Sequence, residues 1–164
     1  MIMKFIADAM LGRLAKWLRI LGFDVLYYRD IDDREVVRIA REQERTILTR
    51  DTQLSNRRGL PGVIFIEKDD VLGQLSQIMA MLDFSQAALS GRCVICNGLL
   101  GEVPQKEEIR DLVPEYIYLN LPRFMRCRGC GKVYWEGSHH RGIRDKVKGV
   151  LSAAAERSLE EGRH

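Results

Sequence analysis

The sequence predicts an α/β protein in which a parallel sheet flanked by helices is followed by a small domain built around cysteines. In the first ninety residues, short apolar segments alternate with segments whose apolar residues recur every three or four positions, the spacing of an amphipathic helix. Strands that alternate with helices indicate right-handed crossovers and a parallel sheet covered on both faces. All four cysteines follow these ninety residues, as two C-x2-C pairs. We expect a first domain at 1–88, a cysteine domain with an inserted helix at 89–148 and a helical tail at 149–164.

Four strands, each followed by a helix or a shorter piece, are expected in the first domain. The expected strands are KFIAD (4–8), DVLYY (24–28), TILT (46–49) and GVIFIE (62–67). The expected helical segments are MLGRLAKWLRILG (10–22), DREVVRIAREQER (33–45), a brief irregular or helical piece ending at Arg58, and DVLGQLSQIMAML (70–82). In the first helix, apolar positions 11, 14, 15, 18 and 21 predict the buried face. Trp17 is expected at the margin of the core and Gly22 as the C-terminal cap.

Every expected strand runs into acidic residues, and in a parallel sheet such positions meet at one edge. The acidic residues concerned are Asp8, Asp30, Asp32, Asp33, Asp51, Glu67, Asp69 and Asp70. Carboxylates gathered at one edge repel one another unless a cation neutralises them. Their hard oxygen atoms suit Mg2+ or Mn2+. The pattern therefore predicts a divalent-metal site at this edge of the sheet.

Helix capping is the alternative explanation for these acidic residues. Asp32 stands three residues before Glu35, the spacing of a capping box, and Asp51, Asp69 or Asp70 can each cap the helix that follows. For any one of them taken alone, capping is the better explanation. Asp8 differs because it ends the expected central strand. The metal hypothesis depends on all four strands ending in acid.

The cysteine pairs predict a structural zinc site. Cys93 and Cys96 form one C-x2-C loop and Cys127 and Cys130 the other, separated by thirty residues. Four thiolates close a tetrahedron around zinc and leave no open position for chemistry. Disulfides are the alternative, but a cytoplasmic chain would keep these cysteines reduced. Gly98 and Gly131 follow the two loops, and we expect them to supply the positive backbone dihedrals of these turns.

The segments around the cysteines predict a zinc ribbon with an elaborated loop. QKEEIRDLVPEY (105–116) predicts a short helix that stops at Pro114, and YIYLN (116–120) resembles a strand. KVYWEG (132–137) is expected to be the return strand of the ribbon. Residues 140–161 carry a helical pattern rich in Ala, Glu and Arg, and a terminal helix is expected there.

Positive charge is concentrated near the second cysteine pair. The chain has a formal net charge of +3, but residues 123–148 hold eight Lys and Arg against two acidic residues. Such a stretch attracts polyanions, although a solvated charged face is an equal alternative. No apolar run is long enough to span a membrane. The apolar stretch at the N-terminus is too short for a signal peptide, so a cytoplasmic protein is expected.

Several of these segments together resemble one protein family. They are FIADAMLGRLAKWLRILGFDVLYY, DIDD, ILTRD, RCVICNGLL and FMRCRGCGKVYWEGSHH. In this order they resemble the PIN-related ribonuclease family named after the C-terminal domain of the Mut-seven exonuclease, over roughly residues 3–148. The resemblance implies a PIN-like nuclease core fused to a zinc ribbon. It also implies a divalent-metal site formed by Asp8, the Asp32/Asp33 pair and Asp51, with Asp69 or Asp70 as the acid of a fourth position.

The function this implies is hydrolysis of RNA phosphodiester bonds with Mg2+ or Mn2+ as the catalytic cofactor. Candidates for phosphate contact are Arg13 and Lys16 on the first helix, Arg50, and Arg141 and Arg144 in the basic stretch. For Arg13 and Lys16 a solvated helix face is the alternative, and it is slightly favoured. The alternative is a non-catalytic RNA-binding or ribosome-binding module, in which the acidic residues are caps. His139 and His140 could join a phosphate or metal site. A phosphatase of the haloacid-dehalogenase type needs a second Asp where Met10 stands.

Overall fold

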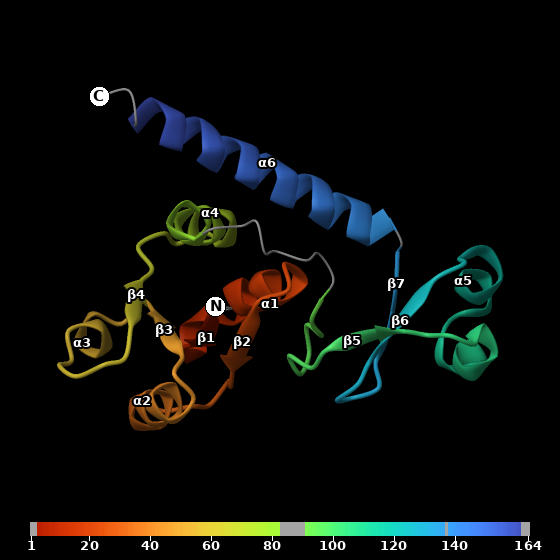
Figure 1. The fold of residues 1–164 in the computed structure, drawn as a ribbon, viewed down its shortest axis with the longest axis horizontal. Helices are drawn as coiled ribbons and strands as arrows, with labels where there is room; N and C mark the ends of the chain where they lie inside the picture. The colour runs from red at the N-terminus through yellow and green to blue at the C-terminus, as the bar shows by residue number, and fades with distance from the viewer. Residues whose placement is uncertain (1–2, 83–90, 137, 162–164) are drawn as a thin grey trace.

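The structure, a computed structural model, describes residues 3–82, 91–136 and 138–161. For part of the last helix only the backbone is described, so the side chains of His139, His140, Arg141 and Arg144 lie outside the described residues. The fold is the expected α/β architecture: a four-stranded parallel sheet flanked by helices, followed by a three-stranded antiparallel sheet that carries the cysteines (Figure 1).

The parallel sheet has the strand order β2-β1-β3-β4. Its strands are β1 (Lys4–Ala7), β2 (Asp24–Tyr27), β3 (Thr46–Thr49) and β4 (Val63–Phe65). The short turn η1 (Ala9–Leu11) leads into α1 (Gly12–Ile20), and the later crossovers contain α2 (Asp33–Glu42) and α3 (Thr52–Ser55), before α4 (Val71–Met81). Because β1 and β3 lie side by side while the chain leaves β1 for β2 on the other side, the strand order reverses between β1 and β3. Ligands of open α/β sheets bind at such a reversal, outside the carboxyl ends of the strands.

Helices cover both faces of the parallel sheet. Side chains alternate along its central strands, so neighbouring residues of one strand pack on opposite faces. Phe5 and Ala7 of β1 belong to a core cluster with α1, α4 and Val147 of the last helix. Ile6, between them, belongs to a second cluster with α2 and with Leu54 of α3. The predicted apolar face of the first helix is buried, Trp17 packs at its margin, and Gly22 has a φ of 91° at its C-terminal end.

The cysteine domain is an antiparallel ribbon with an insertion. Its strands are β5 (Leu100–Glu102), β6 (Phe124–Cys127) and β7 (Val133–Trp135), in the order β5-β6-β7. The insertion between β5 and β6 contains η3 (Lys106–Leu112) and α5 (Glu115–Asn120). The prediction that YIYLN resembles a strand was wrong, because these residues lie within α5. Pro114 at the N-cap begins this helix, and one apolar side, Ile117, Tyr118 and Leu121, packs on the ribbon core.

The last helix, α6 (Ser138–Glu161), begins two residues before the predicted start at 140. It packs along α4, on the opposite side of the parallel sheet from α2 (Figure 1). Val147, Val150 and Leu151 contribute to the cluster formed with α1 and α4, so the chain returns from the ribbon to cover the first domain. Among the described helices, none combines the length and the apolar character needed to cross a membrane.

A polar network joins the first cysteine loop to the free edge of β2. Asn97 accepts a hydrogen bond from Val25 N at 3.0 Å and donates to Asp24 Oδ1 at 2.8 Å. Buried Arg19 donates to the carbonyl oxygens of Val25 on the sheet and of Val94 on the loop, at 2.9 and 3.0 Å. Asn97 of the loop and Arg19 of α1 therefore take the N–H and the carbonyl oxygen that Val25 directs away from β1.

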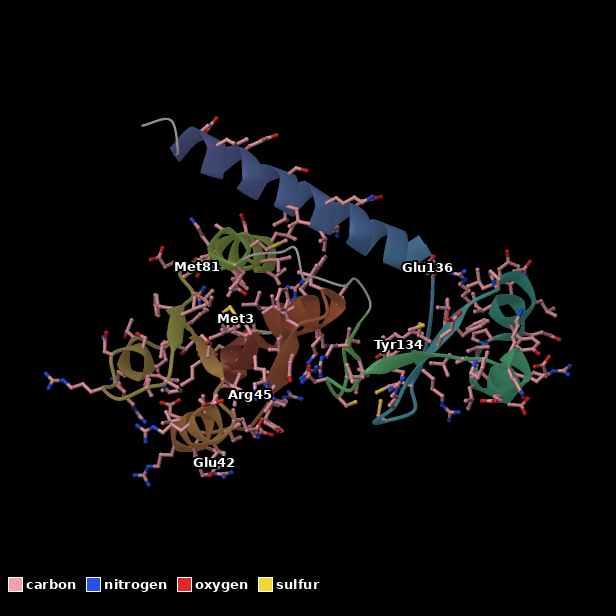
Figure 2. The ribbon with its side chains drawn as sticks, viewed as in Figure 1. Met3, Glu42, Arg45, Met81, Tyr134 and Glu136 are labelled. Atoms are coloured by element: carbon pink, nitrogen blue, oxygen red, sulfur yellow. The ribbon has the colours of Figure 1, made fainter. Side chains whose placement is uncertain are left out.

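The same network contains a nearly buried ion pair. Arg45 Nη1 lies 2.7 Å from Asp24 Oδ1 and also donates to the carbonyl oxygen of Phe5 at 3.1 Å. Arg45 lies beside the sheet, well away from the ribbon strand that carries Tyr134 (Figure 2). Burial raises the pKa of Asp24, but hydrogen bonds from Arg45 and Asn97 lower it more, and the resulting pKa is below its ordinary value of 3.8.

We expect Asp24→Ala to lower the free energy of unfolding by roughly 3 kcal/mol, because it leaves the buried Arg45 guanidinium without a counter-charge. Denaturant unfolding at pH 7 measures this effect. Glu35→Ala is the control, since Glu35 pairs with Arg38 on the exposed face of α2 and should change stability little. Equal effects of the two variants would contradict the assigned role of the buried pair.

The stabilisation by Asp24 should also depend on pH. A carboxylate whose pKa is lower in the folded state stabilises fully above its unfolded pKa, and this contribution is lost as pH falls through the folded pKa. The stability gap between wild type and Asp24→Ala should therefore be constant above about pH 4 and shrink below it. Denaturant unfolding at pH 7 and at successive values below pH 4 gives the result, and a gap independent of pH would contradict it.

Candidate functional site

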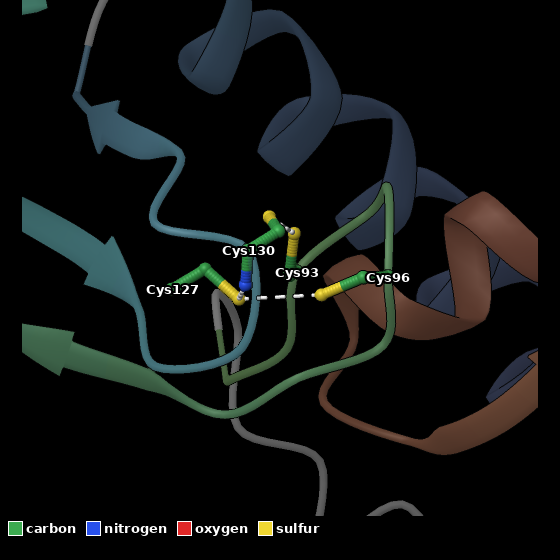
Figure 3. A group of neighbouring side chains, drawn as sticks. All are labelled: Cys93, Cys96, Cys127 and Cys130. Carbon is green, nitrogen blue, oxygen red and sulfur yellow. Dashed lines mark hydrogen bonds between the residues drawn. The ribbon is translucent and has the colours of Figure 1, made fainter.

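The four cysteine sulfurs gather at one point between the two loops (Figure 3). Their Sγ atoms all lie within 4.8 Å of one another, and none forms a disulfide. Cys93 and Cys130 are 3.7 Å apart and Cys96 and Cys127 are 3.4 Å apart, measured between sulfurs. A tetrahedral zinc ion with Zn–S bonds of about 2.3 Å needs sulfur separations of about 3.8 Å. The cluster can therefore hold zinc with all four ligands from the protein.

The surroundings of the sulfurs favour negative charge. Burial raises the pKa of Cys93, but the Tyr134 hydroxyl, 3.0 Å from its sulfur, and the N–H groups of Cys96 and Ile95 lower it to about 6. The Gly98 N–H lowers the pKa of Cys96, whereas burial and the neighbouring sulfurs raise it to about 11. One thiolate thus suppresses ionisation of another, and a bound cation removes this conflict.

The loop glycines differ in role from the prediction. Gly131 has the expected positive φ, 77°, but in the first loop the positive φ of 67° belongs to Asn97. The prediction of a positive dihedral at Gly98 was therefore wrong. Gly98 is needed for space, because a Cβ atom there would lie 2.8 Å from the sulfur of Cys127. Asn tolerates the left-handed conformation better than most residues. Unlike a glycine at this position, Asn97 also has a side chain that contacts β2.

The carboxyl ends of β1 and β3 bring Asp8 and Asp51 to the point where the strand order reverses. Asp8 is 6% exposed, and its Oδ2 accepts from the Thr49 hydroxyl at 2.5 Å and from Arg50 N at 3.0 Å. Its Oδ1 accepts from Met10 N at 2.9 Å. Among the described residues no cationic side chain forms an ion pair with Asp8, in contrast to Asp24.

Asp51 belongs to the same hydrogen-bonded unit. Its N–H donates to the hydroxyl of Thr49 at 2.9 Å, and that hydroxyl donates to Asp8. Its Oδ1 caps α3 by accepting from Gln53 N and Leu54 N at 2.7 and 3.3 Å. Within the described part of the chain, Oδ2 of Asp51 accepts no hydrogen bond. Capping therefore uses one oxygen atom of this side chain and leaves the other available.

The remaining acidic residues are engaged elsewhere. Asp32 caps α2 through Glu35 N at 2.9 Å, while Asp33 lies 3.7 Å from Arg57. The capping box predicted at Asp32 is half formed, because the Glu35 side chain pairs with Arg38. Asp70 caps α4. Among the described residues the cysteines form the only group of three or more metal-ligand side chains, so the acidic residues are not gathered as closely as the sulfurs.

The predicted phosphate-binding residues are placed as follows. Arg13 and Lys16 are exposed on α1, and Arg13 lines a cleft of about 330 Å³ together with Met10, Asp69 and Asp70. Arg50 instead contacts the carbonyl oxygen of Lys68 and the Asp69 carboxylate. The side chains of Arg141 and Arg144 lie outside the described residues.

Comparison with known families matches residues 3–147 to the Mut7-C RNAse domain. The chain belongs to the Mut7-C RNAse domain family. The match confirms the resemblance found in the sequence and includes both the acidic strand ends and the four cysteines. Among curated proteins and among solved structures, no match was found. Membership in the Mut7-C RNAse domain family points to a ribonuclease-type protein that binds nucleic acid.

Two residues of this Mut7-C RNAse domain were missed by sequence reasoning. Thr49 is fully buried and joins Asp8 to Asp51. The sequence signal for this role was a hydroxyl residue at the end of the expected buried strand TILT, two positions before Asp51. Tyr134 contacts the sulfur of Cys93. It occupies the middle of β7, where the sequence shows only the alternation of a strand.

Thr49→Val tests the link between the two strand ends of the Mut7-C RNAse domain. We expect it to lower the free energy of unfolding by about 1–3 kcal/mol, because the Asp51 N–H loses its acceptor and buried Asp8 loses a donor. Thr49→Ser keeps the hydroxyl and is the control, expected to retain most of the stability. Denaturant unfolding compares them. A Val variant as stable as the Ser variant would show that the hydroxyl does not join the strands.

Tyr134→Phe tests the support of the cysteine cluster. The variant should bind zinc about 10-fold more weakly or worse, because Cys93 loses a hydrogen-bond donor that stabilises its thiolate. Competition with a chromogenic chelator measures the affinity, and elemental analysis should find one zinc per chain in wild type. Cys127→Ser marks complete loss of the site and should destabilise the ribbon. Unchanged affinity in Tyr134→Phe would exclude a supporting role of its hydroxyl.

Proposed function

We propose that this protein is a metal-dependent ribonuclease that hydrolyses RNA phosphodiester bonds at the carboxyl edge of the parallel sheet, with the zinc ribbon as a structural element that aids RNA binding. One observation carries the proposal. Asp8 is a buried carboxylate at the reversal of strand order, and it has no cationic partner among the described residues. A buried charge is costly unless it is paired or holds a metal.

The donor set fits Mg2+ or Mn2+. Asp8 Oδ1 accepts one hydrogen bond and Asp51 Oδ2 accepts none among the described residues, so both retain lone pairs for a cation. Mg2+ is commonly held by one or two carboxylates and keeps several waters. A dense group of three carboxylates is therefore not required. We assign Asp8 and Asp51 as the principal ligands, with Asp32 and Asp33 at the head of α2 completing the acidic site.

The chain's own groups would position the substrate. A bound divalent cation activates water for attack on phosphorus and stabilises the leaving oxygen. The Thr49 hydroxyl donates to the Asp8 carboxylate and accepts from the backbone N–H of Asp51, so it fixes the Asp8 side chain relative to the backbone that carries Asp51. Arg13, on the wall of the cleft with Met10, can bind a phosphate oxygen of the strand that enters. Arg50 is held by Asp69, so a phosphate would have to compete with that carboxylate.

A non-catalytic RNA-binding module is the second candidate. It is favoured by the caps that Asp32, Asp51 and Asp70 form, since these bonds alone give three of the acidic residues a structural role. Titration with Mn2+ separates the two functions. A nuclease site should bind Mn2+ beyond the one zinc of the cysteine cluster, and a binding module should not.

Substitutions at Asp51 test the proposal through opposite effects on stability and activity. Asp51→Asn keeps the cap but removes a charged ligand, so thermal stability should be retained or rise. Mn2+-dependent cleavage of labelled RNA should fall by roughly 100-fold or more, because metal stabilisation of the transition state is worth several kcal/mol. Asp8→Asn should show the same loss of cleavage.

Two further variants complete this experiment. Asp51→Ala also removes the cap and should cost ~1 kcal/mol of stability. Asp111→Asn, on the ribbon insertion, is the control for loss of a negative charge and should cleave as wild type does. Cleavage near the wild-type rate in both Asp8→Asn and Asp51→Asn would refute the assigned site.

A further inference from the structure

The N-terminus and one side of α2, from Arg34 to Glu42, border a groove that is rich in arginine. The groove has a volume of about 460 Å³ and lies between α2 and the segment that connects α3 to β4. We call it the arginine groove; its lining residues are Arg34, Val37, Arg38, Arg41, Glu42, Arg57, Arg58 and Leu60. Five of these eight are arginines. Glu42 is the last residue of α2, whereas Asp33, at the other end of the helix, follows the carboxyl end of β2.

Folding explains three of the five arginines. Arg38 pairs with Glu35 and Glu42 on its own helix. Arg41 donates to the carbonyl oxygen of Gly59 at 3.0 Å, where the chain turns with a φ of 73°. Arg57 lies 3.7 Å from Asp33. These contacts hold the connecting segment against α2 and keep the groove open.

Arg34 and Arg58 have no such role. Both are exposed, and neither has an acidic or hydrogen-bonded partner among the described residues. Two unpaired guanidinium groups in one concave surface repel one another and add nothing to the packing. Guanidinium groups bind phosphate oxygens through two parallel hydrogen bonds, so this arrangement suits a phosphate-bearing ligand.

The position of the groove indicates which ligand. Arg34, Arg38 and Arg41 recur along one side of α2 over a length of ~10 Å. The groove begins beside Asp33, which pairs with Arg57 and which the proposed function places in the acidic site. A strand bound along the arginines would therefore lead to the carboxyl edge of the sheet. Val37 and Leu60 add apolar surface for a ribose or base.

We propose that the arginine groove binds the phosphate backbone of single-stranded RNA and guides it to the acidic edge. Its volume of about 460 Å³ is that of a small-ligand site, which holds a short segment of a single strand but not an A-form duplex. The choice of RNA as the polyanion rests on the proposed function, whereas the binding of phosphate rests on the groove. This surface is separate from the basic stretch at 123–148.

Binding of RNA without cleavage tests the groove. Zinc-loaded full-length protein, without added Mg2+ or Mn2+, is titrated into a fluorescein-labelled 12-nucleotide polyuridine, and anisotropy is followed at several salt concentrations. Arg34→Gln combined with Arg58→Gln should weaken binding roughly 20-fold near 0.1 M salt and reduce the slope of log affinity against log salt by about 1.4, because two phosphate contacts are lost. Both side chains are exposed and unpaired, so thermal unfolding should be unchanged.

The matched control removes two cations at the other end of the molecule. Lys106 and Arg110 lie over the ring of Tyr118 on the ribbon insertion, far from α3 in Figure 1. Both residues lie outside the basic stretch at 123–148, through which the ribbon would aid RNA binding. Lys106→Gln combined with Arg110→Gln should therefore leave affinity within about twofold of wild type, apart from the long-range effect of net charge. Equal weakening by the two double variants, or no weakening by the groove variant, would overturn the proposal.

Competition distinguishes the ligand classes. Unlabelled polyuridine should displace the probe at far lower concentration than polyglutamate of equal charge or an RNA duplex. Equal displacement by polyglutamate would identify the groove as a site for acidic protein segments and overturn the RNA assignment. The test of the groove is independent of catalysis. If RNA binds through the groove but is not cleaved with Mn2+, only the ribonuclease function is refuted. If the groove variant cleaves subsaturating RNA as wild type does, only the groove is refuted.

Discussion

The carboxylate of Asp24 is the point at which the two halves of the molecule are joined. Asp24 is the first residue of the edge strand β2. Its carboxylate accepts hydrogen bonds from Arg45 and Asn97, and its Oδ2 lies 3.8 Å from Arg92 Nη2. Arg45 extends the connection to β1 through the carbonyl oxygen of Phe5. Arg19 forms the parallel connection from α1 to the cysteine loop. The position of the ribbon relative to the sheet depends on this network, because the apolar clusters of the two halves are separate.

Two aspartates of the same sheet, Asp8 buried and Asp24 partly buried, illustrate how environment decides role. Asp24 is neutralised by arginine and stabilises the fold. Asp8, at the carboxyl end of the neighbouring strand β1, accepts hydrogen bonds from two backbone N–H groups and a hydroxyl, and from no cation in the described part of the chain. Those donors orient the carboxylate without cancelling its charge. The metal site proposed at Asp8 requires this second arrangement, since an arginine paired with Asp8 would occupy the position of the proposed cation.

The parts of the fold that repeat a local period were predictable from sequence. The alternation of strands and helices, the buried face of α1 and the paired cysteines all follow from spacing along the chain. The C-terminal part of the insertion was not, because the six residues of α5 contain more strand-forming than helix-forming side chains and packing on the ribbon decides the outcome. The positive φ at Asn97 also escaped prediction, since glycine normally takes that conformation and Gly98 stood next to it.

The candidate site divides in the same way. Sequence placed Asp8 and Asp51 at strand ends, and the strand order brings those ends together. It could not show that Thr49 links them, because a hydrogen bond between neighbouring strands depends on register. The arginines of α2 and its neighbouring segment looked like ordinary surface charge. Only the folded connection between α3 and β4, held by Arg41 and Arg57, places them around one groove.

The covering of β2 by the first cysteine loop has a consequence for the protein's behaviour when the metal is lost. β2 is the outermost strand beside β1, and Asn97 occupies its Val25 N–H through a side chain rather than through a strand. Removal of zinc or oxidation of the sulfurs would free the loop and expose an unpaired strand edge with Val25 and Leu26. Unprotected edges template pairing between chains. Loss of metal from the cysteine cluster would thus expose the adjacent edge of β2, whereas the hydrogen bonds at Asp8, at the carboxyl end of β1, do not involve the loop.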